Sequence, residues 1–296
     1  MGIALSFAAM LCFASNILLT RYALARMPLE AGFFVVLGVN VLFPAALFGA
    51  ELAARAAPWT WDWKNAGLFA LAGIIGTFVG RKALFDAVKL LGPARASVFH
   101  STAPIFALIG AWLFASERLG AYEFCIVIVV MVGLLFTQPR ATYTSKHPDA
   151  SALRNGMLSG IVAVAGFGMG NVVRGIAVRE WNEPILGAVL ASVTALALQV
   201  AATRGWAGIG AHLRKADRAA WLLYAGCGVA TTFGSIFLAM AMRHMEIALS
   251  VLVVHSTPLV IFPVSVFVLR NREEVTGRTV MGAALVLTGI VLLSLR

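Results

Sequence analysis

Charged residues are scarce in this sequence. They make up 12% of the chain, while apolar residues make up 60% and the mean hydropathy is +0.90. Soluble globular domains carry about 25% charged residues. The composition therefore excludes a soluble enzyme or binding module and predicts an integral membrane protein.

Cysteine and recognisable catalytic motifs are also scarce. The three cysteines, Cys12, Cys125 and Cys227, fall inside apolar runs without the spacing of metal ligands, so we expect no disulfide framework and no zinc site. No HExxH, GxSxG or paired-carboxylate arrangement occurs, which argues against an enzyme. We therefore expect no cofactor, no metal site and no catalytic residue.

Long apolar runs are what the sequence has in abundance. About 20 apolar residues cross a bilayer as a helix, whereas the strands of a membrane barrel are shorter and alternate. The fold class that we predict is all-α, with ten transmembrane helices at residues 2–25, 31–53, 65–88, 94–115, 120–137, 155–178, 184–203, 219–243, 248–269 and 278–295. The first run has no basic residue ahead of it, so we expect it to be retained rather than cleaved as a signal peptide.

The chain contains an internal repeat. The stretch GRKALFDAVKLLGPARASVFHSTAP, which starts at Gly80, aligns without a gap with GSIFLAMAMRHMEIALSVLVVHSTP, which starts at Gly234. The only long polar segment runs from Thr137 to Asn155 and separates two groups of five apolar runs. We therefore predict a first repeat at residues 1–137, a polar connecting loop at 138–154 and a second repeat at 155–296.

The odd number of spans in each repeat determines their relative orientation. A second copy that begins on the opposite side of the membrane is inserted upside down, which is the scheme of many secondary transporters. In such proteins the substrate site lies near the midplane, between the repeats. The repeat thus predicts two inverted five-helix units around a central cavity, and favours transport over a duplication that serves stability alone.

Two segments of the sequence resemble those of a known family. The segments STAPIFALIGAWLFASER from Ser101 and STPLVIFPVSVFVLRNREE from Ser256 each combine Ser/Thr before proline, an apolar run and a closing glutamate. This pattern is similar to that of the EamA-type drug/metabolite transporter superfamily. The resemblance implies ten helices around a central cavity and export of amino acids or other metabolites. Small multidrug relatives use a glutamate in their first helix, but residues 2–25 contain no acid, which disfavours cationic drug/proton antiport of that kind.

The basic residues inside predicted spans include Arg81, Lys82 and Arg174. A charge near the centre of a membrane helix costs about 2.5–3.5 kcal/mol on insertion scales, so such residues are usually functional. Lys82 and Asp86 share a helix face and can pair, whereas Arg81 lies about 100° away, beside Thr77 and Phe85. We predict that Arg81, Lys82 and Arg174 bind a carboxylate or phosphate; the alternative is that the arginines extend to the lipid headgroups.

Polar residues on other spans complete the predicted site. Pro104 and Pro258 free backbone carbonyls, which survive in a membrane only where buried polar groups or cavity water satisfy them. We therefore expect polar residues near these prolines, and asparagines at similar places in the two repeats, to bind substrate; they are His100, Thr102, His255, Ser256, Asn16 and Asn171. For the histidines, proton coupling and bonding to a neighbouring helix both stay open. For the asparagines, an interhelical bond is the alternative.

The functional prediction is a secondary-active transporter in the cell (inner) membrane. It exports a small carboxylate-bearing metabolite, such as an amino acid, by alternating access. The alternatives are a membrane-embedded lipid-modifying enzyme, and a transporter of nucleotides, sugars or drugs. The partners expected are the small-molecule substrate, the lipid bilayer and, as an open possibility, protons.

A net charge of +10 is compatible with nucleic-acid binding, but the basic residues flank apolar runs. We therefore expect no nucleic-acid partner. More of the basic residues follow odd-numbered runs than even-numbered ones. The positive-inside rule then puts both termini outside the cell, whereas the resemblance implies cytoplasmic termini. Both orientations stay open.

Overall fold

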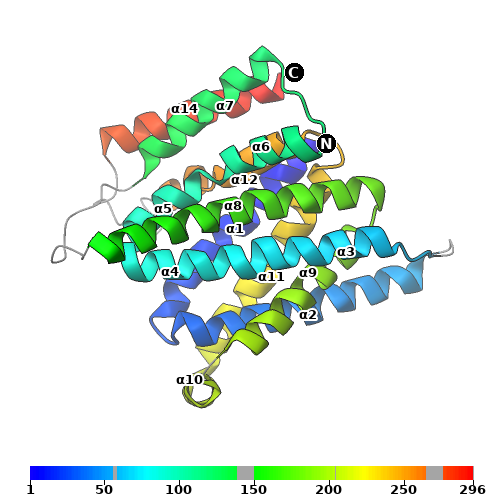
Figure 1. Ribbon diagram of the computed structural model, residues 1–296, viewed down its shortest axis with the longest axis vertical. Coiled ribbons are helices and arrows are strands. Elements are labelled where there is room, and N and C mark those ends of the chain that lie inside the picture. The colour runs from blue at the N-terminus through cyan, green and yellow to red at the C-terminus, as the bar shows by residue number, and fades with distance from the viewer. Residues whose placement is uncertain (56–58, 139–149, 204, 265–275, 296) are drawn as a thin grey trace.

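All regular structure that a computed structural model describes, at residues 1–55, 59–138, 150–203, 205–264 and 276–295, is helical (Figure 1). Most of the polar connecting loop, and Glu273 at the end of the second proline segment, lie outside these residues. The elements are α1 (Gly2–Leu24), α2 (Leu29–Ala54), α3 (Trp63–Ala72), η1 (Gly73–Gly80), α4 (Arg81–Leu91), α5 (Pro93–Ser101), α6 (Ala103–Phe114), α7 (Ala121–Thr137), α8 (Ala150–Glu180), α9 (Pro184–Ala202), α10 (Trp206–Lys215), α11 (Arg218–Ala241), α12 (Ile247–His255), α13 (Pro258–Pro263) and α14 (Gly277–Ser294).

Seven helices or continuous helix groups in the described part of the chain are long and apolar enough to cross a membrane. They occupy residues 2–24, 29–54, 63–91, 95–114, 151–180, 184–202 and 218–241, and each coincides with one predicted span. Three shorter apolar helices occupy residues 121–137, 247–261 and 277–293. The all-helical membrane class is therefore confirmed, while the number of ten spans stays a prediction.

Helices from the two halves of the chain pack against each other. The main neighbours are α1 with α11, α2 with α9, α6 with α12 and α7 with α14, and α8 lies along α3, η1 and α4. Figure 1 shows α8 beside α4 and α3, and α14 beside α7. Because every one of these pairs joins the first half to the second, the structure is one interlocked bundle.

A glycine-to-glycine contact brings η1 and α8 together. A Cβ atom added at Gly170 would lie 2.7 Å from the Cα of Gly76, and one at Gly166 would lie 2.9 Å from the Cα of Gly80. Each helix thus contributes two glycines four residues apart, the spacing that permits backbone contact between membrane helices. The η1 segment is a π-helix, a form that often occurs at functional sites, and it leads directly into Arg81.

Two helices are interrupted at equivalent places in the two halves. The chain between α5 and α6 turns at Thr102, which has φ −90° and ψ 0°, one residue after Ser101. The chain between α12 and α13 turns at Ser256 and Thr257, immediately before Pro258. A proline cannot donate a backbone hydrogen bond within a helix, so each helix stops and restarts there.

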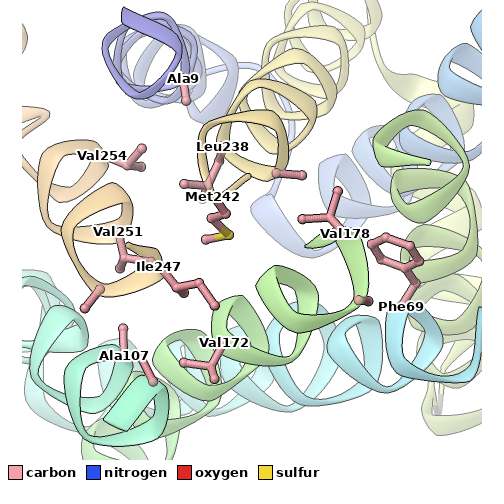
Figure 2. Packing of buried hydrophobic residues seen from close by; sticks show 14 residues of the cluster. Ala9, Phe69, Ala107, Val172, Val178, Leu238, Met242, Ile247, Val251 and Val254 are labelled. Carbon is pink, nitrogen blue, oxygen red and sulfur yellow. The ribbon is translucent and has the colours of Figure 1, made fainter. Parts of the chain in front are cut away.

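The bundle has two distinct ends. One end carries Met1, with Glu117 paired to Arg179, and is called the terminal end here. The other carries the pairs Arg26–Asp217 and Lys89–Glu30, and is called the basic end. The main apolar core lies towards the terminal end, where Figure 2 shows Leu238, Met242, Ile247 and Val251 converging between α11 and α12.

Candidate functional site

A cavity of about 750 Å³ lies between the two halves of the chain. It extends from the middle of the bundle to the basic end, where its rim includes Arg21 and Leu24, and Leu24 is 47% exposed. Small-molecule sites in proteins usually have volumes of about 300–1,000 Å³. The polar and aromatic lining residues are Phe13, Asn16, Thr20, Arg21, Phe33, Thr77, Arg81, Phe85, Ser97, His100, Ser101, Gln138, Phe167, Asn171, Arg174, Tyr224, Thr231, Ser235, His255 and Thr257.

Arg81 reaches the cavity from the first turn of α4. Thr77 and Phe85, four residues before and after it, line the same cavity, as the helical period requires. The guanidinium carbon lies 4.9 Å from the ring centre of Phe33, which provides a cation–π contact. Its Nε atom is buried without a hydrogen-bond partner, and the described residues place no carboxylate in an ion pair with it. The group therefore retains hydrogen-bond donors for an acceptor that the protein does not supply.

Asn171, which directly follows Gly170, and Arg174, one helical turn beyond it, present a second polar group. Arg174 Nη1 donates a hydrogen bond to Asn171 Oδ1 at 3.2 Å. Both residues line the cavity from α8, the helix that packs against η1 and α4. The glycine contact thus places Arg81 and Arg174 on adjoining helices, at different depths of one wall.

The two predicted histidines meet in the cavity. The rings of His100 on α5 and His255 on α12 have centres 5.4 Å apart, at an interplanar angle of 32°. His255 Nδ1 lies 2.9 Å from the carbonyl oxygen of Val251, and His100 contacts the ring of Phe167 at 5.2 Å. Because both rings sit at the ends of interrupted helices, the breaks beside Pro104 and Pro258 set their position.

The lining is basic. Arg21, Arg81 and Arg174 contribute three guanidinium groups, whereas no described lining residue is aspartate or glutamate. Apolar surroundings weaken the screening of these charges. The cavity therefore attracts anions and repels cations.

The structure brings six of the nine predicted site residues to one cavity, namely Asn16, Arg81, His100, Asn171, Arg174 and His255. Three others lie outside its lining. Lys82 is exposed on the outside of α4, with its Nζ 5.9 Å from the ring centre of Phe78, and Asp86 does not form an ion pair with it in the described residues. Thr102 donates to the carbonyl of Phe99 at 2.7 Å and Ser256 to that of Leu252 at 3.1 Å, so both hydroxyls are used within their own helices.

Sequence reasoning did not find the aromatic wall or the residues of α11. Phe13, Phe33 and Phe167 come from three different helices, and an isolated phenylalanine in an apolar run carries no signal of its own. Thr231 and Ser235 carried a usable signal, because they align in the internal repeat with Thr77 and Arg81. Asn40 forms an interhelical contact instead, with its side-chain amide 3.0 Å from Thr231 Oγ1.

Comparison with known proteins identifies the family. The model of the EamA-like transporter family matches residues 1–138 and 154–295. The chain belongs to the EamA-like transporter family. A solved structure titled "Crystal structure of protein" superposes on it with a TM-score of 0.74 at 18% sequence identity, and the match covers 99% of this chain and 96% of that one. A search of curated proteins found no match.

Membership in the EamA-like family confirms the resemblance stated from the two proline segments. It also identifies the chain as a multi-pass membrane transporter of the drug/metabolite type. The solved structure shares the fold over 99% of this chain, including both halves that enclose the cavity.

An apolar seal closes this EamA-like cavity towards the terminal end. Leu238 and Val254 line the cavity and also belong to the buried cluster that contains Val172, Met242 and Ile247 (Figure 2). These last three residues are fully buried. The cavity therefore has access from the basic end and is blocked at the terminal end.

Proposed function

We propose that this EamA-like protein is a secondary-active transporter that carries a small carboxylate-bearing metabolite by alternating access. In this proposal ten spans form two inverted five-helix repeats, and the substrate binds between them. Net transport is outward. The substrate class includes organic acids and amino acids.

The observation that carries the proposal is the surroundings of the Arg81 guanidinium in the cavity. A guanidinium has five donors and no acceptor, and the described residues around Arg81 provide an aromatic ring but no carboxylate. A planar carboxylate can accept two parallel hydrogen bonds from such a group. An anionic substrate would therefore supply the partner that the bundle leaves out.

The packing of the bundle supports the inverted repeat. In the sequence alignment, α1 corresponds to α8, and α3, η1 and α4 correspond to α11. When the two halves are exchanged, the contact of α1 with α11 corresponds to the contact of α8 with α3, η1 and α4. The contacts of α2 with α9 and of α7 with α14 each correspond to themselves. A two-fold relation between the halves predicts this exchange of partners.

The asymmetry of access supports alternating access and outward transport. The cavity is reached from one end and sealed at the other, as expected for one of two alternating states. Its open end is also the end rich in basic residues, which include Arg26, Lys89, Arg154 and Arg218. By the positive-inside rule this end faces the cytoplasm, where an exporter takes up its substrate.

Counterflow in proteoliposomes tests the proposal. Vesicles with purified protein are loaded with one candidate solute, and uptake of the same labelled solute is followed for amino acids, organic acids, nucleosides and cationic dyes. We expect saturable counterflow of carboxylates, with little movement of cationic dyes.

Two matched variants link the flux to the site. Arg81→Gln removes the cavity guanidinium, and Lys82→Gln removes the neighbouring charge, which lies outside the cavity. Arg81→Gln should abolish the flux and Lys82→Gln should preserve it. Equal effects of the two substitutions, or the absence of flux for every carboxylate, would overturn the proposal.

A further inference from the structure

The described lining of the cavity offers no acidic side chain to a second, positive charge on the substrate. An α-amino acid at neutral pH carries an ammonium group beside its carboxylate, and that group brings three donors and no acceptor. Arg21, Arg81 and Arg174 share the cavity with it, and no acid among the described lining residues offsets them. The ammonium would thus lie among like charges.

Some neutral acceptors in and near the lining already take part in hydrogen bonds. Asn171 Oδ1 already accepts from Arg174 at 3.2 Å, and Thr20 Oγ1 donates to the carbonyl of Asn16 at 2.7 Å. The carbonyl oxygen of Val251 lies 2.9 Å from His255 Nδ1. These oxygens are neutral, so hydrogen bonds to them would not offset the repulsion between an ammonium group and the three guanidinium groups.

Donors, in contrast, are available. Arg81 has a buried Nε without a partner, and the side-chain amide of Asn16 faces the cavity with no hydrogen-bond partner among the described residues. A substrate with an additional oxygen acceptor beside its carboxylate would satisfy these donors, whereas an ammonium at the same place would not.

The remaining surface fits an apolar body. Phe13, Phe33, Phe85 and Phe167 approach the cavity from four helices, and the rings of Phe33 and Phe85 make an edge contact at 5.6 Å. Aromatic edges and faces pack well against flat or branched apolar groups. The wall therefore favours a substrate with one anionic end and an apolar remainder.

On the basis of the proposed function, we infer that the substrate is an organic anion rather than a zwitterionic amino acid. The polar groups of this anion are all hydrogen-bond acceptors, and its body is apolar. A 2-oxo acid has this chemistry. The ketone oxygen adds an acceptor at the carbon where an amino acid carries its ammonium. The two compounds otherwise share one carbon skeleton, so they form a matched pair.

Counterflow of matched pairs tests the inference. Phenylpyruvate is compared with phenylalanine, and 4-methyl-2-oxopentanoate with leucine, in proteoliposomes of the intact protein at neutral pH. We expect each 2-oxo acid to be exchanged about tenfold or more faster than its amino acid at equal concentration, since a missing hydrogen-bond partner discriminates strongly in a polar site.

A charge introduced into the cavity gives a second, independent test. Asn16→Asp is isosteric, and Ser235→Asp places a carboxylate on α11; each should raise phenylalanine counterflow relative to phenylpyruvate within the same variant. Asn40→Asp is the control, because the Asn40 side chain is not among the lining residues and is screened from the cavity by Thr231, which it contacts; its ratio should stay that of the wild type.

The outcomes separate this inference from the proposed function. If amino acids move as fast as their 2-oxo acids, the inference is overturned while carboxylate transport stands. If Asn16→Asp and Ser235→Asp leave the ratio unchanged, the charge argument is likewise overturned. If no carboxylate moves at all, both the inference and the proposed function fail.

Discussion

Arg179 at the end of α8 pairs with Glu117 beyond the end of α6, with Nη2 and Oε1 2.7 Å apart. The two side chains also hold the turn between α11 and α12. Arg179 donates to the carbonyls of Met242 and Met245 at 2.7 and 2.8 Å, and Glu117 accepts from the backbone N–H of Ile247 at 2.7 Å. This latch ties α6, α8 and α12 together over the apolar seal at the terminal end.

Weakening the latch should open the terminal end. Glu117→Gln keeps an acceptor for the α12 amide but removes the charge that Arg179 meets, and Glu117 is only 6% exposed, so the pair is weakly screened. We expect a cysteine at Val172, in a background without Cys12, Cys125 and Cys227, to react with a membrane-impermeant maleimide several-fold faster in Glu117→Gln than in the parent.

A neighbouring ion pair provides the control for that experiment. Glu180 pairs with Lys64 at the same end, but both side chains are largely exposed, so Glu180→Gln should leave the labelling rate unchanged. Identical labelling of Val172→Cys in the Glu117→Gln and parent proteins would show that the pair does not hold the seal.

Substitution of the contact glycines should destabilise the bundle unequally. A Cβ at Gly170 would lie 2.7 Å from Gly76 Cα, whereas a Cβ at Gly76 would find its nearest atom at 3.5 Å, and one at Gly38 would meet nothing within 4 Å. Overpacking costs about 1–3 kcal/mol. In detergent, Gly170→Ala should therefore lower the Tm clearly, Gly76→Ala only slightly, and Gly38→Ala not at all. Equal Tm values for all three would refute the close contact of η1 with α8.

The pair Arg26–Asp217 predicts a pH-dependent stability. Asp217 caps α11 and accepts a hydrogen bond from the N–H of Ala220 at 2.8 Å. This hydrogen bond and the guanidinium of Arg26 lower the pKa of the Asp217 carboxyl. A lowered pKa in the folded state stabilises the protein at pH values above the pKa of the unfolded state, about 3.9. This contribution is lost as the pH falls through the pKa of the folded state.

Asp217→Asn tests this linkage because asparagine keeps a capping oxygen but cannot ionise. Its Tm should lie below that of the wild type at pH 7, and the two values should converge below about pH 4. A difference that is independent of pH would mean that the carboxylate charge contributes nothing.

Membrane orientation is a separate prediction. If the basic end faces the cytoplasm, both termini lie outside. An epitope tag at either terminus should then be removed by protease added to intact cells, while a tag in the segment between α7 and α8 should be protected. The opposite pattern would place the cavity opening of this state outside the cell, without bearing on which solute is carried.

The sequence predicted the elements of the site that follow from local spacing. Thr77, Arg81 and Phe85 share a face by the helical period, and that face lines the cavity. Pro104 and Pro258 drew attention to the histidines beside them, and the structure places the rings of His100 and His255 5.4 Å apart. Such features depend on residues close in the chain or on the duplication, so a sequence contains them.

Other features depend on contacts that spacing does not encode. Lys82 was expected beside Arg81 in the site, but the next residue on a helix points about 100° away, and it lies outside. The π-helical turn of η1 was not foreseen, since its stretch GIIGTFVG has the apolar composition of an ordinary span. The helix α10 was not predicted, because it is only 10 residues long and has charges in its last turn.

The most direct test of the central claim is the charge at position 81. In a background without native cysteines, Arg81→Cys should not exchange carboxylates. Reaction with 2-aminoethyl methanethiosulfonate, which restores a positive charge, should recover part of the counterflow, whereas the negatively charged 2-sulfonatoethyl reagent should not. Equal counterflow with both adducts, or wild-type flux in unmodified Arg81→Cys, would contradict the claim that a cation in this cavity holds the substrate anion.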